Sequence, residues 1–285
     1  MKVAILGANG QLGHILSGWL RHLNYEVKDI TRANLVVDAG TSYDDYVDCL
    51  DYLLEVHNNA KYEYIINCIG ATKPHFNNKA ALADNIYTNA VFPHLLQKYA
   101  SKAGIKVIHI TTDCVFSGTV GKYNENSPHD PLDEYGKSKS LGECQDSMVI
   151  RTSIIGTEEN RGTKRFLIEW LRSNDGKGEV NGFTNHLWNG LTTLELSKAI
   201  AKIIKNDLWS PGTYILHSDD INKADLLREI ATAFNINVSV KDTIAKESCD
   251  RTMRSVKKLN VMLKPVGHRQ MLKELAEWEM STANV

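Results

Sequence analysis

Two side chains that can move a proton stand four residues apart in the stretch DPLDEYGKSKSLGE, where Tyr135 precedes Lys139. Residues i and i+4 of a helix share one face, so a helix here points the phenol and the ammonium group into one pocket. A free tyrosine has a pKa of about 10, which makes it a slow acid or base at neutral pH. A neighbouring cation favours the phenolate, so we expect Lys139 to lower the pKa of Tyr135.

A second group of reactive side chains follows the apolar stretch KVIHI, which suits a buried strand. Thr111, Thr112, Asp113 and Cys114 come directly after it. Adjacent strand residues face opposite sides, so we expect only one of the two threonines to face the tyrosine.

A glycine-rich turn follows the first apolar segment in AILGANGQLG, which contains Gly7, Gly10 and Gly13. A tight turn from strand to helix requires glycine, and the backbone approaches a pyrophosphate closely only where no side chain intervenes. The N–H groups at the start of the following helix then bind the phosphates. We therefore expect a dinucleotide-binding turn, and we include in it the intervening residues Asn9, Gln11 and Leu12.

Apolar segments alternate with helical patterns through the first half of the chain. We expect strands at 2–6, 25–30, 64–69, 106–111 and 148–153, and helices at about 11–23, 42–58, 78–103 and 134–147. Such alternation is typical of a parallel sheet with helices on both faces, and fully buried strands are nearly continuous apolar runs. The sequence therefore predicts an α/β fold, a Rossmann-type doubly wound parallel sheet that forms an NAD(P)-binding domain over residues 1–155.

Beyond about residue 155 the pattern becomes looser and richer in Gly, Asn and charged residues. We expect short strands near Val180 and at 214–217, and helices at 163–173, 192–205, 222–234 and 267–280. We interpret residues 156–285 as mainly a smaller α/β substrate-binding region, of which about 190–210 packs back on the first domain.

Composition excludes several classes of function. The 285 residues are 42% hydrophobic and 24% charged, with a net charge of −1 and no Lys/Arg cluster, so we expect no nucleic-acid or membrane partner. Five scattered cysteines without CxxC or Cys/His spacing indicate free thiols in a reducing compartment and no metal site. The N-terminus resembles a signal peptide only superficially, because its apolar run ends after Leu6 at glycines and Asn9. No stretch reaches the length of a membrane span, so we expect a cytoplasmic protein.

The glycine spacing G-x-x-G-x-x-G resembles the extended, sugar-nucleotide branch of the short-chain dehydrogenase/reductase superfamily. Five segments, GANGQLG, INCIGA, TTDCVFSG, YGKSKSLGE and IRTSIIG, follow in the order seen in dTDP-4-dehydrorhamnose reductase-like proteins. The resemblance implies that Thr112, Tyr135 and Lys139 are catalytic. Thr112 holds a carbonyl group while a nicotinamide delivers hydride to its carbon, and Tyr135 donates a proton to its oxygen. Thr111 is the alternative to Thr112, and Asp113 has a structural or substrate-orienting role.

The resemblance also implies where the cofactor binds. Thr31 and Arg32 stand where an NAD-selective member carries an acidic residue, and an arginine suits a 2′-phosphate. We therefore expect NADPH, with NADH as the alternative. Lys139 holds the nicotinamide ribose, and the further expected cofactor contacts are Cys68, Ile69, Gly70, Asn89, Tyr135, Ser153 and Ile154.

Members of this branch reduce a 4-keto sugar attached to a nucleoside diphosphate, usually in deoxysugar synthesis for surface polysaccharides. A homodimer is compatible with the resemblance. The stretch NGFTNHLWNG combines aromatic and amide side chains that suit a base or a sugar, and arginine binds diphosphate bidentately. The expected substrate contacts are Lys73, Thr112, Asp113, Cys114, Val115, Tyr135, His186, Trp188, Asn189, Arg251 and Arg254.

Cys114 leaves a first alternative open, because rhamnose-type enzymes usually carry tyrosine at this position. GDP-fucose synthase-like enzymes use a cysteine at this offset from the catalytic Ser/Thr as an epimerisation base. With Lys164 or His186 as the partner acid, the protein would be a bifunctional 3,5-epimerase and 4-reductase. Otherwise Cys114 is a small buried side chain that lines the pocket.

Two further alternatives share the fold. One is a non-catalytic regulatory subunit that binds the cofactor as a ligand, against which the retention of all three catalytic residues argues. The other is an NAD-recycling epimerase or dehydratase, for which the acidic pair Asp133–Glu134 before Tyr135 is the feature to compare. The stretch TDCVFSG favours the reductase branch.

Overall fold

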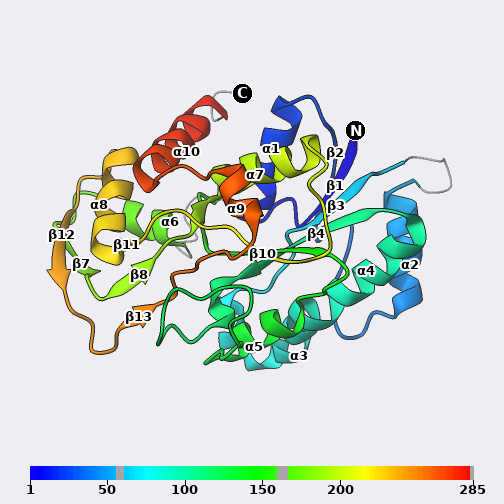
Figure 1. Ribbon diagram of the computed structural model, residues 1–285, viewed down its shortest axis with the longest axis horizontal. Coiled ribbons are helices and arrows are strands. Elements are labelled where there is room, and N and C mark those ends of the chain that lie inside the picture. The colour runs from blue at the N-terminus through cyan, green and yellow to red at the C-terminus, as the bar shows by residue number, and fades with distance from the viewer. Residues whose placement is uncertain (56–60, 159–165, 283–285) are drawn as a thin grey trace.

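The central layer of the molecule is a six-stranded parallel sheet in the order β10-β5-β4-β3-β1-β2 (Figure 1). The computed structural model describes residues 1–55, 61–158 and 166–282. The direction of the strand order reverses between β1 and β3, the type of position at which open α/β sheets bind ligands. The expected fold class is confirmed. The strands are β1 (Lys2–Leu6), β2 (Glu26–Ile30), β3 (Tyr64–Asn67), β4 (Lys106–Thr112), β5 (Met148–Thr152) and β10 (Gly212–Ile215).

Helices cover both faces of this sheet, because successive strand residues point to opposite faces and both sets are apolar. Val3 and Ile5 pack with the helices of one face, whereas Ala4 and Leu6 pack with those of the other. Figure 1 shows α1 and α7 on one side and α2 and α4 on the other. Their bounds are α1 (Gly13–His22), α7 (Thr193–Lys205), α2 (Tyr43–Leu53) and α4 (Phe92–Ala103).

The single helix expected over 78–103 is interrupted by a π-helical turn, Tyr87–Val91, between α3 (Leu82–Ile86) and α4. Pro93 has no N–H and cannot donate to the carbonyl of Asn89, which leaves the helix free to widen there. The helix expected over 134–147 is shorter, because α5 spans only Glu134–Leu141. It ends at Gly142, which lies against the carbonyl of Asn89. A Cβ atom on Gly142 would stand 1.9 Å from the Asn89 oxygen.

The described residues of the C-terminal part form three small sheets beside the main one, at the left of Figure 1. The strand expected at 214–217 belongs instead to the edge of the main sheet, as β10. Several of the additional strands are too short to give a sequence pattern. The strands are β6 (Ile154–Ile155), β7 (Glu179–Phe183), β8 (His186–Trp188), β9 (Leu191–Thr192), β11 (Ile221–Asn222), β12 (Ser239–Thr243) and β13 (Cys249–Asp250).

The further helices among the described residues of this part are α6 (Leu167–Arg172), α8 (Lys223–Ala233), α9 (Lys258–Leu263) and α10 (His268–Thr282). Leu227 and Ile230 of α8 pack with Leu272 and Leu275 of α10 in a separate apolar cluster. In the described ranges no helix has the length and apolarity needed to cross a bilayer.

Candidate active site

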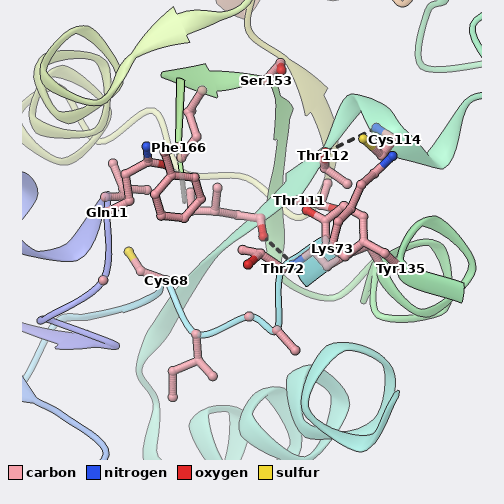
Figure 2. A pocket seen from close by; sticks show the side chains of 18 of the residues that line it. Gln11, Cys68, Thr72, Lys73, Thr111, Thr112, Cys114, Tyr135, Ser153 and Phe166 are labelled. Carbon is pink, nitrogen blue, oxygen red and sulfur yellow. Dashed lines mark hydrogen bonds between the residues drawn. The ribbon is translucent and has the colours of Figure 1, made fainter. Parts of the chain in front are cut away.

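A cavity of about 550 Å³ lies at the carboxyl ends of β1, β3, β4 and β5 (Figure 2). Gln11, Cys68 and Phe166 lie toward one end of it, and Thr112, Cys114 and Tyr135 toward the other. The structure thus brings separate sequence segments to one place. The expected site residues that line the cavity are Asn9, Gly10, Gln11, Leu12, Cys68, Ile69, Gly70, Lys73, Thr112, Asp113, Cys114, Tyr135, Lys139, Ser153 and Ile154.

The glycine-rich turn has the geometry that a bound pyrophosphate requires. Gly7 has a φ of +78°, and its N–H donates to the carbonyl of Ile30 at the end of β2 (2.8 Å). A Cβ atom on Gly13 would stand 2.2 Å from the Gly7 oxygen, so a side chain there would push the turn apart. Gly7 and Gly13 shape the turn, while its tip faces the cavity. These residues fit a dinucleotide.

Arg32 is exposed and stands two residues after Ile30, whose carbonyl accepts from the Gly7 N–H of the turn. Asp29 is already bound, because Ser17 and Arg21 donate to its two oxygens at 2.6 and 2.7 Å. The Thr31 hydroxyl donates to the Asn34 side chain at 3.1 Å. Neither Thr31 nor Arg32 lines the cavity, so their expected contact with the cofactor stays a prediction.

Thr112 lies where β4 ends and a short 3-10 turn, Asp113–Val115, begins. Its hydroxyl donates to an Asp113 carboxylate oxygen (2.9 Å) and accepts from the Cys114 N–H (3.1 Å). Thr111 is only 4% exposed, and its hydroxyl has no hydrogen-bond partner among the residues that the structure describes.

Lys139 is 5% exposed, and its Nζ donates to the carbonyl of Ile110 at 2.9 Å. Burial lowers the pKa of Lys139 to about 8, against the opposing effect of Glu143. Burial raises the pKa of Tyr135, and Cys114 adds to the effect, while Thr112 opposes it. The expectation that Lys139 brings the pKa of Tyr135 down is therefore wrong for this arrangement.

Cys114 lies beside Lys73 in the cavity (Figure 2). The Lys73 Nζ forms an ion pair with Asp133 at 2.9 Å. Burial raises the pKa of the Cys114 thiol to about 12, with Asp113 adding to the effect and Lys73 opposing it. Cys114 is therefore a protonated thiol at neutral pH.

Of the two candidates for a partner acid of Cys114, only His186 lies among the described residues. His186 does not line the cavity, and its Nε2 lies 3.1 Å from the carbonyl of Glu247. Lys164 lies outside the described residues.

Asn89 is fully buried and binds backbone rather than lining the cavity. Its amide nitrogen donates to the carbonyl of Ala71 and its oxygen accepts from the Ala71 N–H, both at 2.9 Å. The same nitrogen lies 3.1 Å from the Ser138 hydroxyl of α5. Asn89 thus joins the loop after β3 to α5, and its expected contact with the cofactor stays a prediction.

None of the five expected substrate contacts in the C-terminal part lines this cavity. Asn189 is 1% exposed and exchanges two hydrogen bonds with the backbone of Met253 (2.8 and 3.0 Å). Arg254 pairs with Asp220, and Trp188 packs on the ring of His268. Each of these three side chains therefore contacts another residue of the C-terminal part.

Two other expected contacts lie next to the cavity. Val115 is fully buried in an apolar cluster with Phe116. Arg251 donates to the carbonyls of Phe116 and Ser117 at 3.0 and 3.1 Å, and its charge acts on Cys114.

Some residues of the site carried no sequence signal. Lys223, the first residue of α8, has its pKa lowered by burial, while the charge of Asp113 opposes the shift. It therefore lies near the end of β4 although it is 110 positions away in the chain. The residues that line the cavity and were not expected are Ala71, Thr72, Pro74, His75, Ile110, Thr152, Glu158 and Phe166. Thr111, expected only as the alternative to Thr112, also lines it. Over the described ranges, no group of three or more His, Cys, Asp and Glu side chains is arranged to hold a metal ion.

Comparison with known families decides the affiliation of the chain. The model of the RmlD substrate binding domain family matches residues 1–285. The chain belongs to this family. Within the RmlD relatives, the spore coat polysaccharide biosynthesis protein SpsK of Bacillus subtilis (strain 168) is 27% identical over 231 residues, 77% of this chain and 74% of that protein. The dTDP-4-keto-6-deoxy-D-glucose reductase of Streptomyces niveus is 25% identical over 211 residues, 71% of this chain and 68% of that protein.

A solved structure with the RmlD fold is the dTDP-4-dehydrorhamnose reductase of Bacillus anthracis in complex with NADP. It is 21% identical, covers 96% of this chain and 98% of its own, and has a TM-score of 0.79. At this identity the likeness establishes the shared fold.

Proposed function

We propose that the protein is an NADPH-dependent reductase that acts on the 4-keto group of a nucleoside-diphosphate-linked 6-deoxy-4-ketohexose. The observation that carries the proposal is the shared cavity: Thr112, Tyr135 and Lys139 line the same space as the tip of the glycine-rich turn. The name of the Streptomyces relative describes this chemistry, and that of the Bacillus subtilis relative supports a role in polysaccharide synthesis.

The nicotinamide of NADPH, when bound, supplies a hydride to the carbonyl carbon. Thr112 and Tyr135 hold the carbonyl oxygen by hydrogen bonds, and Tyr135 transfers its proton to that oxygen. A reductase needs its tyrosine as an acid, and the raised pKa of Tyr135 keeps the phenol protonated through the neutral range. Lys139, with a pKa of about 8, is mainly a cation at pH 7 and holds the ribose hydroxyls.

The preference for NADPH rests on Arg32, which is exposed two residues after Ile30, the hydrogen-bond partner of the glycine-rich turn. Hydrogen bonds to a charged group contribute about 1.5–3 kcal/mol, so Arg32→Ala is expected to weaken NADPH binding by about tenfold or more. The affinity for NADH should not change. Fluorescence titration with both cofactors measures this, and equal losses for the two would contradict the assignment of Arg32 to the 2′-phosphate.

The reaction is tested by NADPH oxidation with a panel of dTDP-, GDP-, CDP- and UDP-linked 4-keto-6-deoxysugars. We expect one or more of them to be reduced, and Tyr135→Phe to abolish the reaction. Tyr52→Phe, at a position that is 74% exposed, is the matched control and should react like the wild type. The proposal fails if no substrate of the panel consumes NADPH. It also fails if Tyr135→Phe leaves the biological activity of the protein unchanged, which is the result expected of a non-catalytic regulatory subunit.

A bifunctional epimerase and reductase is the second candidate, because Cys114 lies in the cavity beside the Lys73 ammonium group. Its pKa of about 12 disfavours a thiolate base and places the pure reductase first. Incubation of enzyme and substrate in D₂O without NADPH separates the two. Deuterium entering C3 or C5, and lost in Cys114→Ser, would establish the epimerase.

A further inference from the structure

The catalytic helix α5 has no apolar face with which to pack. Its buried residues are Gly136, Ser138 and Lys139, and its one aliphatic side chain, Leu141, is 68% exposed. Short helices in proteins are usually stabilised by packing of an apolar stripe, and an eight-residue helix is not stable alone. Polar contacts must therefore hold Tyr135 and Lys139 in place.

Such contacts are found at the start and in the middle of the helix. The Asp133 carboxylate accepts from the Gly136 N–H at 2.8 Å, which caps the first turn. In the middle, the Ser138 hydroxyl meets the buried amide of Asn89 at 3.1 Å. In the last turn, which carries Lys139, the Leu141 carbonyl lies 2.8 Å from Nε2 of His94, and Ser140 makes a further contact.

The last turn is also joined to the sheet by a chain of hydrogen bonds that starts at the half-buried Ser140 and ends at a buried arginine. The Ser140 hydroxyl lies 2.6 Å from Nδ1 of His129, and Nε2 of the same ring lies 2.7 Å from Nη2 of Arg151. Arg151 is 2% exposed on β5 and binds Glu143 bidentately, at 3.0 and 2.6 Å. Glu143 follows α5 directly, so both links return to the catalytic helix.

The chemistry of these groups fixes the direction of each hydrogen bond. Arginine has donors only, so Nε2 of His129 must accept from Arg151. The imidazole is then neutral with its proton on Nδ1, which donates to the Ser140 oxygen. Burial lowers the pKa of His129, which also favours the neutral ring. The guanidinium group is itself held in place, because the Phe116 ring packs 5.1 Å from it.

We propose that Arg151, acting through His129 and Ser140 on one side and Glu143 on the other, is a positioning residue that holds the last turn of α5 and therefore Lys139. The catalytic purpose of this positioning depends on the proposed reductase function. Arg151 lies opposite Thr111 in the register of β4 and β5, one position before Thr112. The same arginine thus links the strand that carries the catalytic hydroxyl to the helix that carries the tyrosine and the lysine.

The test uses two replacements of His129 that fill similar space and differ in their hydrogen bonds. In His129→Phe the ring and its edge contact with Phe116 remain, but both hydrogen bonds are lost. In His129→Gln the amide oxygen accepts from Arg151 and the amide nitrogen donates to Ser140, so the polarity of the chain is preserved. Ser140→Ala breaks the link at the helix, and Ser173→Ala, whose hydroxyl binds the Trp170 carbonyl in α6, is the matched control.

Hydrogen exchange of the α5 amides is the first measurement, and it needs neither substrate nor cofactor. His129→Phe and Ser140→Ala each remove one hydrogen bond to the last turn, which contributes about 0.5–1.5 kcal/mol, so both should speed exchange of its amides by about 2- to 13-fold. Exchange in β1 should not change. His129→Gln and Ser173→Ala should behave like the wild type. Unchanged exchange in both Ser140→Ala and His129→Phe, or equal acceleration in His129→Gln and His129→Phe, overturns the proposal.

The second measurement is kinetic and separates this proposal from the proposed function. With a reduced substrate of the panel, His129→Phe should lower kcat by about tenfold while the KM for the sugar nucleotide changes less than twofold, and His129→Gln should restore kcat. If the wild type reduces no substrate, the proposed function is refuted. The hydrogen-exchange measurement then tests the positioning by itself. An active His129→Phe with wild-type kcat refutes the positioning alone.

Discussion

Replacement of Lys139 by methionine is expected to make the protein more stable at neutral pH. The side chain is 5% exposed, and methionine has a similar length. Burial lowers the pKa of Lys139 from 10.5 to about 8, so the folded protein holds this cation at a disadvantage relative to the unfolded chain. At about 1.4 kcal/mol for each unit between the two pKa values, the disadvantage is about 3 kcal/mol at pH 7.

The substitution also removes the hydrogen bond from Lys139 to the carbonyl of Ile110, which contributes about 1 kcal/mol. The net expectation is a variant that is more stable by about 2 kcal/mol at pH 7. Between pH 8 and 10.5 the unfolded wild type binds one more proton at this lysine than the folded protein, so wild-type stability rises relative to the variant. Above that range the order reverses, and the variant is less stable by about 1 kcal/mol.

Urea unfolding of both proteins at a series of pH values measures the difference, and NADPH oxidation measures activity. Lys137→Met, an exposed position on the same helix, is the control and should show no pH-dependent difference from the wild type. Lys139→Met should be inactive at every pH. A variant less stable than the wild type at pH 7, or a difference that does not change from pH 7 to 10.5, would refute the reasoning.

Three further outcomes are expected. Gly13→Ala, whose Cβ would stand 2.2 Å from the Gly7 oxygen, should lower the unfolding free energy by about 1–3 kcal/mol and abolish NADPH binding. Gly18→Ala in the same helix meets nothing closer than 3.4 Å and should be neutral or stabilise by up to about 1 kcal/mol; calorimetry that ranks the two equally contradicts this. Asn89→Ala should lower the free energy of unfolding in urea by about 2–3 kcal/mol. A change below about 0.5 kcal/mol, the level of a surface substitution, would contradict the role of Asn89 in joining the loop after β3 to α5. Iodoacetamide should alkylate Cys114 slowly at pH 7 and faster with each rise in pH, since its thiol has a pKa of about 12; a rate that levels off near neutral pH rules out that protonation state.

The parts of the site that the sequence predicts are those encoded within single short segments. The glycine-rich turn and the Tyr135/Lys139 pair are each contained in a few adjacent positions, where helical or turn geometry fixes the relative placement. The alternation of apolar runs likewise predicts the parallel sheet. These features depend on local backbone geometry, which sequence spacing describes directly.

The parts that the sequence does not predict depend on contacts between distant positions. The aromatic and amide composition around Trp188 and Asn189 suits a sugar site, but Asn189 binds the backbone of Met253, 64 positions away. Composition alone does not distinguish a side chain that packs within the C-terminal part from one that faces a ligand. Lys223 reaches the neighbourhood of Asp113 only because α8 begins there, and no motif marks it.

The pKa of Tyr135 shows why one motif supports two different chemical interpretations. Spacing places the lysine one helical turn from the tyrosine, and a cation there is expected to favour the phenolate. In the folded protein the Lys139 Nζ binds the Ile110 carbonyl, and burial raises the pKa of Tyr135. In the proposed reductase, the protonated tyrosine donates the proton and the buried cation binds the ribose. Both states suit reduction of a carbonyl, because that direction consumes the tyrosine proton and requires no phenolate at the start.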